Sequence, residues 1–566
     1  MIAKRTRCRR SRLNSEMGFR YWLERTPSTG GPRTLSINSS ILFDKADQTI
    51  IGSNFSNSEL RFRKYVRLAR FVAPSPVRRP ILVIGSRVSE LEVTGPAVLQ
   101  ALVPSDQSTE TDDDTLSVPR YFFLYNKNKK ETSAANPSEP PRIIGGELVL
   151  VTGRDPENEF VMEFRDPVTQ DYPSDSGNLL SNLPSGVEVT TNLKVTGLRI
   201  QGKNRLGFGA WVTFGWVDGL TVVNCHGHEG TQVGFGFQFC RDVRISRCSG
   251  RHLPKLDPPD ESEPWGYTFQ INRSVEVDIE ACIAENAQYA LTVEGGSAAV
   301  RANNLYYFGS GDRTDQTCFD IHGGEAFNIQ VRLAVSPNSG ISLGNTSWRR
   351  GAADVIISKC FATRLRITSG LHDLAVNDCS FQNVKFEYTS QDPNPGSWNS
   401  NPIDVSFAGC TIDIPDSHPD AYAVSLPVNG AVNQSSYEID NLSFTECTIT
   451  NQGNTAVLFV GANTKDSSSI SFDSCTLTLP GSSAANDAII IQTDSQSPSP
   501  LSLSLTVSDT VFLMANNQDI ARGSNATTTT KFFDSGVNLR GPAMNNLRDI
   551  CKNDVTGMDN STLPNC

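Results

Sequence analysis

Apolar and polar residues alternate along most of this chain in a short motif that recurs every 19 to 37 residues, apart from one gap of 78. The motif is an apolar residue, any residue, a second apolar residue, two further residues and then Cys or a substitute. It reads LTVVNC at 220–225, VRISRC at 243–248, VDIEAC at 277–282, VIISKC at 355–360, LAVNDC at 374–379, VSFAGC at 405–410, LSFTEC at 442–447, ISFDSC at 470–475 and LTVSDT at 505–510, with earlier relatives at 91–96 and 193–198. The gap of 78 fits three coils of 26, and the missing members are expected near 291–296, 299–304 and 327–333.

This repeat predicts stacked short strands. Alternation of period two places the two apolar positions on one strand face. The two residues that follow are often Gly, Asn, Asp or Ser, which tolerate tight corners. A period of this length with variable spacing is typical of a solenoid. We therefore predict an all-β fold, a right-handed single-stranded parallel β-helix with an irregular N-terminal region and a C-terminal cap.

The repeat explains the positions of most of the cysteines. Eight of the 13 share its last position, so we expect them to be small buried residues rather than disulfides or metal ligands. Cys551 and Cys566 lie outside the repeat and could form a bridge. No CxxC pair supports a zinc site. We predict no metal and no cofactor.

Polar inserts divide the chain into four predicted regions. These are a basic N-terminal arm (1–35), N-terminal coils with inserted loops (36–190), the regular β-helix (191–515) and a C-terminal cap with a polar tail (516–566). Within the second region, 41–62 resembles an opening coil.

Charge narrows the functional classes. The formal net charge is −11, which does not favour general binding of nucleic acid. No apolar run approaches the ~20 residues that span a bilayer. The basic start is not followed by an apolar stretch, so it is not an ordinary signal peptide; it could be a docking arm for a larger assembly.

Candidate chemistry gathers between residues 225 and 350. In CHGHEG, His226 and His228 are two apart and would share a strand face, with Glu229 next to them. They could be turn residues, substrate contacts or, less simply, metal ligands, since two histidines do not make a site.

A second cluster is RHLPKLDPPDESEPWGYTF. Trp265 and Tyr267 could pack on the apolar face of a sugar beside charged groups such as Lys255. Alternatively, the aromatic residues anchor a solvated insert to the core.

A third cluster is SGDRTDQTCFDIHGGEAF. Carboxylates here could divide acid and base roles in glycoside hydrolysis, or a base with Arg313 could abstract the proton beside a uronate carboxylate. Turn-forming aspartates and a packed histidine remain the structural alternative. The candidate catalytic residues are Asp320, His322, Asp312, Asp315, Glu325 and Glu229, and the candidate substrate-binding residues are Arg313, Trp265, Tyr267, His228, Lys255 and Arg349.

The ladder motif over roughly residues 40–515 resembles that of the pectate-lyase-like β-helix superfamily. Locally, WGYTFQINRSVEVDIEACIAENAQYALTVEGG followed by FDIHGG resembles the middle coils of phage tailspikes and related polysaccharide-active β-helix proteins. The calcium-binding carboxylates and arginine signature of pectate lyases are not recognised.

The resemblance implies a tailspike-like protein of the virion tail that binds a host surface polysaccharide and could depolymerise it by lyase or hydrolase chemistry. It also implies a homotrimer, which could be attached to a tail or baseplate through the N-terminal arm. From the charge and the apolar runs we expect no nucleic-acid partner and no membrane span. The alternatives are a secreted or cell-surface polysaccharide lyase or glycoside hydrolase, and a non-catalytic structural or adhesive β-helix.

Overall fold

The computed structural model covers the whole chain, and its described residues are concentrated in strands. They are 20–21, 33–35, 41–43, 49–51, 58–61, 82–85, 120–126, 130–131, 142–143, 146–154, 162–169, 178–183, 187–201, 210–228, 233–253, 266–309, 317–321, 326–343, 352–368, 371, 373–387, 404–416, 422–426, 441–453, 456–460, 469–479, 489–492, 504–508, 510–514, 521–524, 529–532 and 538–540.

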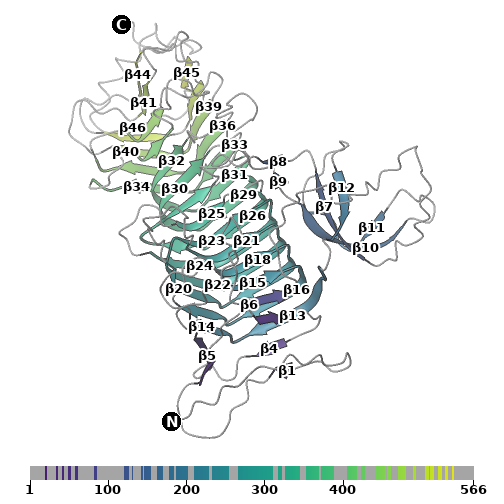
Figure 1. Cartoon of the computed structure of the whole chain (residues 1–566). Coiled ribbons are helices and arrows are strands. Elements are labelled where there is room, and N and C mark those ends of the chain that lie inside the picture. Colours follow the sequence, from purple (N-terminus) through teal and green to yellow (C-terminus); the bar gives the residue numbers. More distant parts are fainter. Residues whose placement is uncertain are drawn as a thin grey trace.

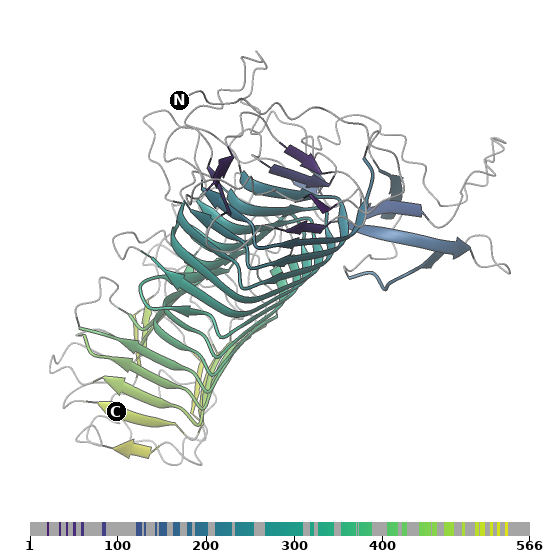
Figure 2. The same ribbon diagram turned by 90° about the horizontal axis from the view of Figure 1, so that it is seen from below.

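The solenoid is built from three ladders of parallel strands, and each coil of the chain contributes to all three in turn (Figures 1 and 2). The first ladder contains β1 (Arg20–Tyr21), β4 (Thr49–Ile51), β13 (Thr190–Thr196), β16 (Val217–Val223), β19 (Arg241–Ser246), β22 (Val275–Ala287), β24 (Ala298–Phe308), β26 (Ala326–Arg332), β29 (Ala352–Ser358), β31 (Leu374–Asn377), β33 (Asp404–Ala408), β36 (Asn441–Thr445), β39 (Ser469–Asp473), β42 (Ser504–Ser508) and β45 (Thr529–Phe532). The second contains β2 (Arg33–Leu35), β5 (Ser58–Arg61), β14 (Arg199–Gln201), β17 (His226–His228), β20 (Ser249–Leu253), the ends of β22 and β24, β27 (Val335–Ser336), β30 (Phe361–Thr368), β32 (Ser380–Glu387), β34 (Thr411–Ile414), β37 (Thr448–Asn451), β40 (Thr476–Leu479), β43 (Val511–Met514) and β46 (Asn538–Arg540).

The third ladder contains β3 (Ile41–Phe43), β6 (Leu82–Gly85), β15 (Ala210–Gly215), β18 (Val233–Gln238), β21 (Tyr267–Asn272), β23 (Tyr289–Glu294), β25 (Thr317–Ile321), β28 (Gly340–Leu343), the ends of β30 and β32, β35 (Val424–Ser425), β38 (Leu458–Val460), β41 (Ile489–Gln492) and β44 (Ala521–Ser524). Parallel crossovers of this kind are right-handed. The predicted all-β, right-handed parallel β-helix is thus confirmed.

The backbone takes the same conformation at the corner before each repeat cysteine. The residue directly before the cysteine position has a left-handed φ, from 52° at Ala281 and Asp378 to 61° at Gly409. Its N–H donates to the carbonyl of the next coil, as Asn224 does to Ser246 at 3.1 Å. Residues other than Gly rarely adopt this conformation, so the ladder hydrogen bonds impose it here.

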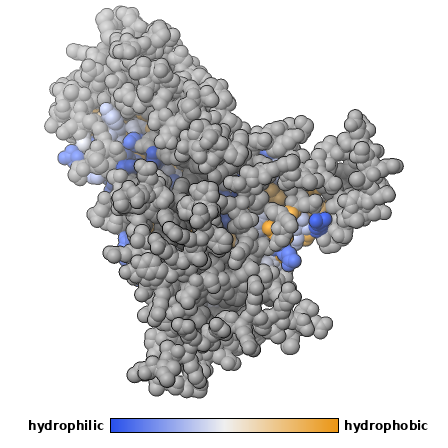
Figure 3. Space-filling model, in the orientation of Figure 1, coloured by the Kyte–Doolittle hydropathy of each residue, from blue (hydrophilic) through white to orange (hydrophobic). Residues whose placement is uncertain are grey.

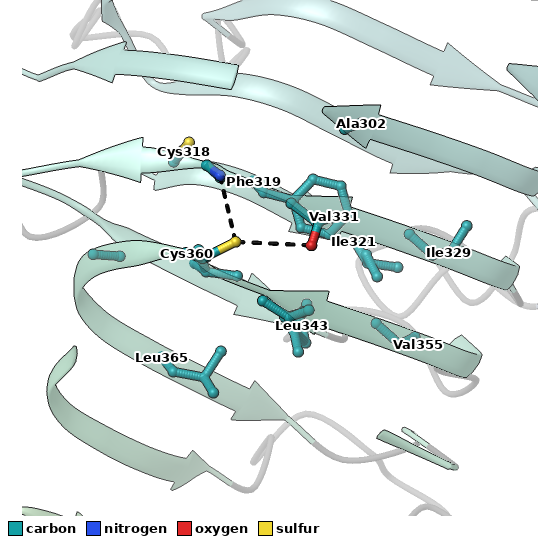
Figure 4. Close-up of a cluster of buried hydrophobic side chains, with 14 of the residues drawn as sticks. Ala302, Cys318, Phe319, Ile321, Ile329, Val331, Leu343, Val355, Cys360 and Leu365 are labelled. Atoms are coloured by element: carbon teal, nitrogen blue, oxygen red, sulfur yellow. Dashed lines mark hydrogen bonds between the residues drawn. The ribbon is translucent and has the colours of Figure 1, made fainter. Parts of the chain in front are cut away.

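Stacked apolar side chains fill the solenoid. One hydrophobic cluster extends from Leu193 to Val507, and Figure 4 shows part of it, where Leu343 and Leu365 lie near Cys360. The Cys360 thiol contacts the Val331 carbonyl oxygen at 3.8 Å. Burial of such parallel strands on the inner face explains their richness in Val, Ile and Leu.

The cysteine prediction is confirmed for the eight repeat positions, which are free and buried, as are Cys240 and Cys318. Cys551 and Cys566 lie outside the described residues. Of the three predicted missing repeat members, 299–304 and 327–333 are first-ladder strands, in β24 and β26. The third, 291–296, falls on β23 of the third ladder, because all three ladders use the same inward alternation.

A separate sheet interrupts the solenoid between β6 and β13. It is antiparallel, in the order β11 (Met162–Phe164), β10 (Glu147–Arg154), β7 (Arg120–Asn126), β12 (Asn178–Asn182), while β8 (Lys130–Glu131) pairs with β9 (Arg142–Ile143). Its Leu148 packs with Trp216 and Phe239 of the solenoid. In Figure 3 the apolar colour gathers where this sheet lies beside the solenoid.

Two regional expectations need correction. Residues 120–182 were expected as coils with loops, but their strands pair antiparallel, because alternation predicts a strand without predicting its partner's direction. β1 and β2 lie within the predicted arm 1–35 yet pair in the ladders, since strands of two or three residues leave no periodic signal. The other regional boundaries remain predictions. No described segment is a helix long and apolar enough to cross a membrane.

Candidate functional site

The outer face of the third ladder has one position per coil that is polar in every coil named below except at Gly236, and we call these positions the axial polar row. On each strand this position lies between two inward-facing core residues, as Asp320 lies between Phe319 and Ile321. Consecutive members are paired in register. They are Thr213, Gly236, Gln270, Thr292, Asp320, Ser342, Arg366 and Lys385.

Most of the row is covered, because Thr213 and Gly236 at one end are buried, as are Thr292, Asp320 and Ser342. Thr292 is 0% exposed, Asp320 4% and Ser342 7%. Gln270, Arg366 and Lys385 are half-buried. Asp320 is therefore an enclosed carboxylate on an outer sheet face, where polar residues are usually solvated.

A second carboxylate lies close to Asp320. Glu294 occupies the next outward position beyond Thr292 on β23, and Thr292 pairs with Asp320 of β25. With strands about 4.8 Å apart and about 3.3 Å per residue, the two acidic residues have Cα atoms roughly 8 Å apart. Glu294 Oε1 accepts hydrogen bonds from the Gln270 amide and, at 3.3 Å, from the Asn272 amide. These two amides hold the Glu294 carboxylate on the sheet face.

Tyr267 is wrongly predicted as an exposed sugar-stacking ring. It is 1% exposed and packs with Val233 in a small cluster outside the main core. Its ring centroid lies 5.1 Å from that of Tyr289, which pairs with it on the neighbouring strand and is half-buried. Tyr267 also has the same parity as the core residues Phe269 and Ile271, so the alternation itself indicates a buried position.

His228 lies on a different face from Asp320. It is on β17 of the second ladder, where Gly227 faces inward and both His226 and His228 face outward. The His228 ring meets the His252 ring edge to face, with centroids 5.0 Å apart. Beside them Arg251 Nε contacts Glu285 Oε2 at 3.2 Å. The histidine cluster is thus separate from the axial polar row.

The remaining candidates lie outside the described residues. They are Glu229, Lys255, Trp265, Asp312, Arg313, Asp315, His322, Glu325 and Arg349. Whether they join Asp320 stays a prediction. Within the described part of the chain, no group of three or more His, Cys, Asp or Glu side chains could hold a metal ion.

Sequence reasoning missed four polar residues of this face: Glu294, Gln270, Arg366 and Lys385. Each stands between or directly after the apolar residues of a third-ladder strand. The alternation predicts that each of these residues faces outward. It does not predict which strands lie in the same ladder, because that depends on how the coils stack. Only the register brings residues tens of positions apart onto one face.

Comparison with known proteins gives distant likenesses in fold. No protein-family model and no curated protein matches the chain. Among solved structures, the tailspike protein gp49 from Pseudomonas phage LKA1 is 14% identical over 90% of this chain and 73% of its own, with a TM-score of 0.41. PfbA, a surface adhesin of Streptococcus pneumoniae, is 13% identical over 58% of this chain and 85% of its own, with a TM-score of 0.40.

A third similar structure is the gp54 tailspike of Acinetobacter baumannii bacteriophage AP22 in complex with A. baumannii capsular saccharide. It is 14% identical over 88% of this chain and 73% of its own, with a TM-score of 0.38. The fold of this chain is established by its own three ladders of parallel strands. Because the likenesses are remote, activity has to be inferred from this chain's own residues.

Proposed function

We propose that this protein binds a polysaccharide along the outer face of its third ladder and hydrolyses it at Asp320 and Glu294. The observation that carries the proposal is the placement of these two carboxylates on one face of neighbouring strands, with neutral hydrogen-bonding residues around them. The Gln270 amide, which is half-buried, would bind a sugar hydroxyl beside the acidic pair.

The chemistry follows from the pair. One carboxyl group protonates the glycosidic oxygen as its bond to the anomeric carbon breaks. The other carboxylate takes a proton from the water molecule that adds to that carbon. Side chains that leave one sheet face in parallel keep roughly their ~8 Å backbone separation, which falls in the 6.5–9.5 Å range of inverting glycosidases. We therefore expect inversion at the anomeric centre.

We propose further that the protein acts as a homotrimer on a virion tail. An exposed stripe on the second ladder supports self-association. Ile283 (36% exposed), Tyr306 (38%), the half-buried Val335 and Phe361 (48%) stand in register on consecutive strands. Exposed apolar residues that are contiguous in this way are typical of protein–protein contact sites.

The test of function is incubation of the full chain with a panel of surface polysaccharides, with detection of new reducing ends. Reducing ends without new ultraviolet absorbance support hydrolysis. Absorbance from unsaturated ends identifies a lyase and contradicts the proposed reaction. Binding without any cleavage contradicts catalysis and favours an adhesive β-helix.

A further inference from the structure

Two amide side chains of β21 converge on one oxygen of Glu294. The Gln270 Nε2 group donates a hydrogen bond to Glu294 Oε1, and the Asn272 Nδ2 group donates a second one at 3.3 Å. Asn272 stands directly opposite Glu294 in the register of β21 and β23, and Gln270 stands opposite Thr292. We call Gln270 and Asn272 the amide clamp. The two clamp residues and Glu294 are half-buried, so solvent reaches this cluster in part.

The backbone beside Glu294 makes room for the clamp. Gly295 has a left-handed φ of 67°, and a Cβ atom at this position would clash with Asn272 Oδ1. The carbonyl end of the Asn272 amide therefore lies over Gly295, and its NH₂ end points at Glu294. Because a larger residue at position 295 would displace this amide, the fold of the coil sets the direction of the hydrogen bond.

The clamp suits a carboxylate that works as a base. An ionised carboxylate only accepts hydrogen bonds, and N–H donors stabilise its negative charge. Glu294 is also the more open member of the acidic pair, since Asp320 is 4% exposed, so water from solvent reaches Glu294 more readily. Arg273 follows the clamp in sequence, and its guanidinium lies over the Phe239 ring, 5.4 Å from the ring centroid.

We propose that Glu294 is the catalytic base of the hydrolysis and that Asn272 and Gln270 position it, which gives the acid role to Asp320. This inference rests on the proposed function, because it divides the two roles of that reaction between the pair. The attacking water passes a proton to Glu294 Oε2 as the water oxygen bonds to the anomeric carbon. Asp320 gives its proton to the glycosidic oxygen, whose bond to the same carbon breaks.

Azide distinguishes the base from the acid. Azide attacks the anomeric carbon without a proton to lose, so it needs no base. The substrate is the polysaccharide of the panel that the wild type cleaves fastest. Sodium azide should raise the rate of Glu294→Ala at least about tenfold and yield a glycosyl azide, identified by mass spectrometry. Asp320→Ala should gain no rate, because the leaving oxygen still lacks its proton.

Positioning by the clamp is tested at Asn272, because the proposed function also gives Gln270 a glycan contact. Loss of the Asn272 donor makes Glu294 harder to ionise, so the acid limb of the kcat profile should move to higher pH in Asn272→Leu. The shift should be larger in Asn272→Asp, which adds a like charge. On that limb kcat should fall about tenfold, while KM stays near the wild-type value. Asn272→Asp keeps the size of the side chain, so the test stands if Asn272→Leu does not fold.

The matched control is Gln330→Met, which removes an outward amide from the first ladder, where Gln330 Nε2 donates to Asn328 Oδ1 at 3.4 Å. Its kcat and pH profile should equal those of the wild type. Circular dichroism melting of each variant checks the fold.

Three results overturn the inference while the proposed function stands. Azide rescue of Asp320→Ala, or of neither variant, removes Glu294 from the base role. An acid limb that does not move in either Asn272 variant means that the amide only supports the fold. A wild type that cleaves no polysaccharide contradicts the proposed function, and the inference with it.

Discussion

Arg241 of β19 and Glu147 of β10 form a buried ion pair, with Nη1 and Oε2 3.8 Å apart and side chains 1% and 0% exposed. Arg241 also donates to the Leu148 carbonyl at 3.1 Å and to Glu276 Oε1 at 3.1 Å. Glu147 accepts the Thr169 backbone N–H through both oxygens. The ion pair therefore joins the antiparallel sheet to the solenoid through two buried, desolvated side chains.

Arg241→Met is expected to destabilise the protein by about 3–5 kcal/mol, because it leaves Glu147 buried without its cation. Urea unfolding followed by fluorescence measures the change. Arg244→Met on the same strand is the control: Arg244 is 69% exposed and contacts Asp242 at 3.6 Å. That exposed pair should contribute less than about 1 kcal/mol. Equal losses in both variants would mean that the buried pair does not hold the two parts together.

Val376→Asp should prevent folding. Val376 is 0% exposed in the first ladder, and an unpaired charge there costs several kcal/mol. Soluble yield and the far-ultraviolet spectrum report the outcome. Ala375→Asp tests the alternation directly, because Ala375 is the half-exposed neighbour on the opposite face. It should fold normally, and two variants of similar yield would contradict the assigned faces.

The solenoid was predictable because every coil repeats the same inward pair, and eight cysteines mark one register. The antiparallel sheet was not, since a strand such as β10 shows the same alternation whichever way its partner runs. Left-handed corners at Arg247, Leu333 and Lys359 also leave no sequence signal. Their backbone is fixed by hydrogen bonds between coils, not by local preference.

The site was predictable only in part. Asp320 stands out as a carboxylate within a run of buried residues, and the structure places it on the third ladder. Glu294 and Arg366 could not be joined to it from the sequence, because coil lengths vary and the register between coils depends on every corner in between. His228 has promising chemistry in sequence but faces a different side of the solenoid.

The ten described cysteines should resist thiol reagents in the native protein. All ten thiols are buried, so reagents do not reach them. For Cys240, burial also raises the pKa to about 12, which keeps that thiol protonated at neutral pH. Titration with a disulfide reagent at pH 8 is expected to label at most three of the 13 cysteines, and all 13 after reduction and unfolding in guanidinium. Rapid native labelling of more than three would contradict the buried ladder.

The same thiol predicts a pH dependence of stability. Because the folded pKa of Cys240 is raised, the folded state favours the protonated thiol. Its contribution is complete below the unfolded value of about 9 and is lost as pH rises toward 12. Cys240→Ala should therefore show a smaller loss of stability between pH 9 and 11 than the wild type. Identical slopes would contradict this assignment.

Phe361→Asp should convert a trimer to monomers, because it places a charge in the exposed stripe beside Tyr306 and Val335. Light scattering at micromolar concentration measures the mass. Ile356→Asp is the control, since Ile356 is 41% exposed on the first ladder, away from the stripe. A monomeric wild type would reject the homotrimer. Dissociation by both variants would reject the second ladder as its interface.

Asp320→Asn and Glu294→Gln should each lower kcat by about 10²–10⁴-fold, the usual contribution of a positioned acid or base. Both substitutions keep the size of the side chain, so glycan affinity should change by only a few-fold. Asp278→Asn provides the control, because Asp278 is 51% exposed on the first ladder and pairs with Arg301. The stereochemistry of the first product, followed by proton NMR, should show inversion. Full activity in either variant would remove that residue from catalysis, and retention would contradict the ~8 Å separation proposed for the pair.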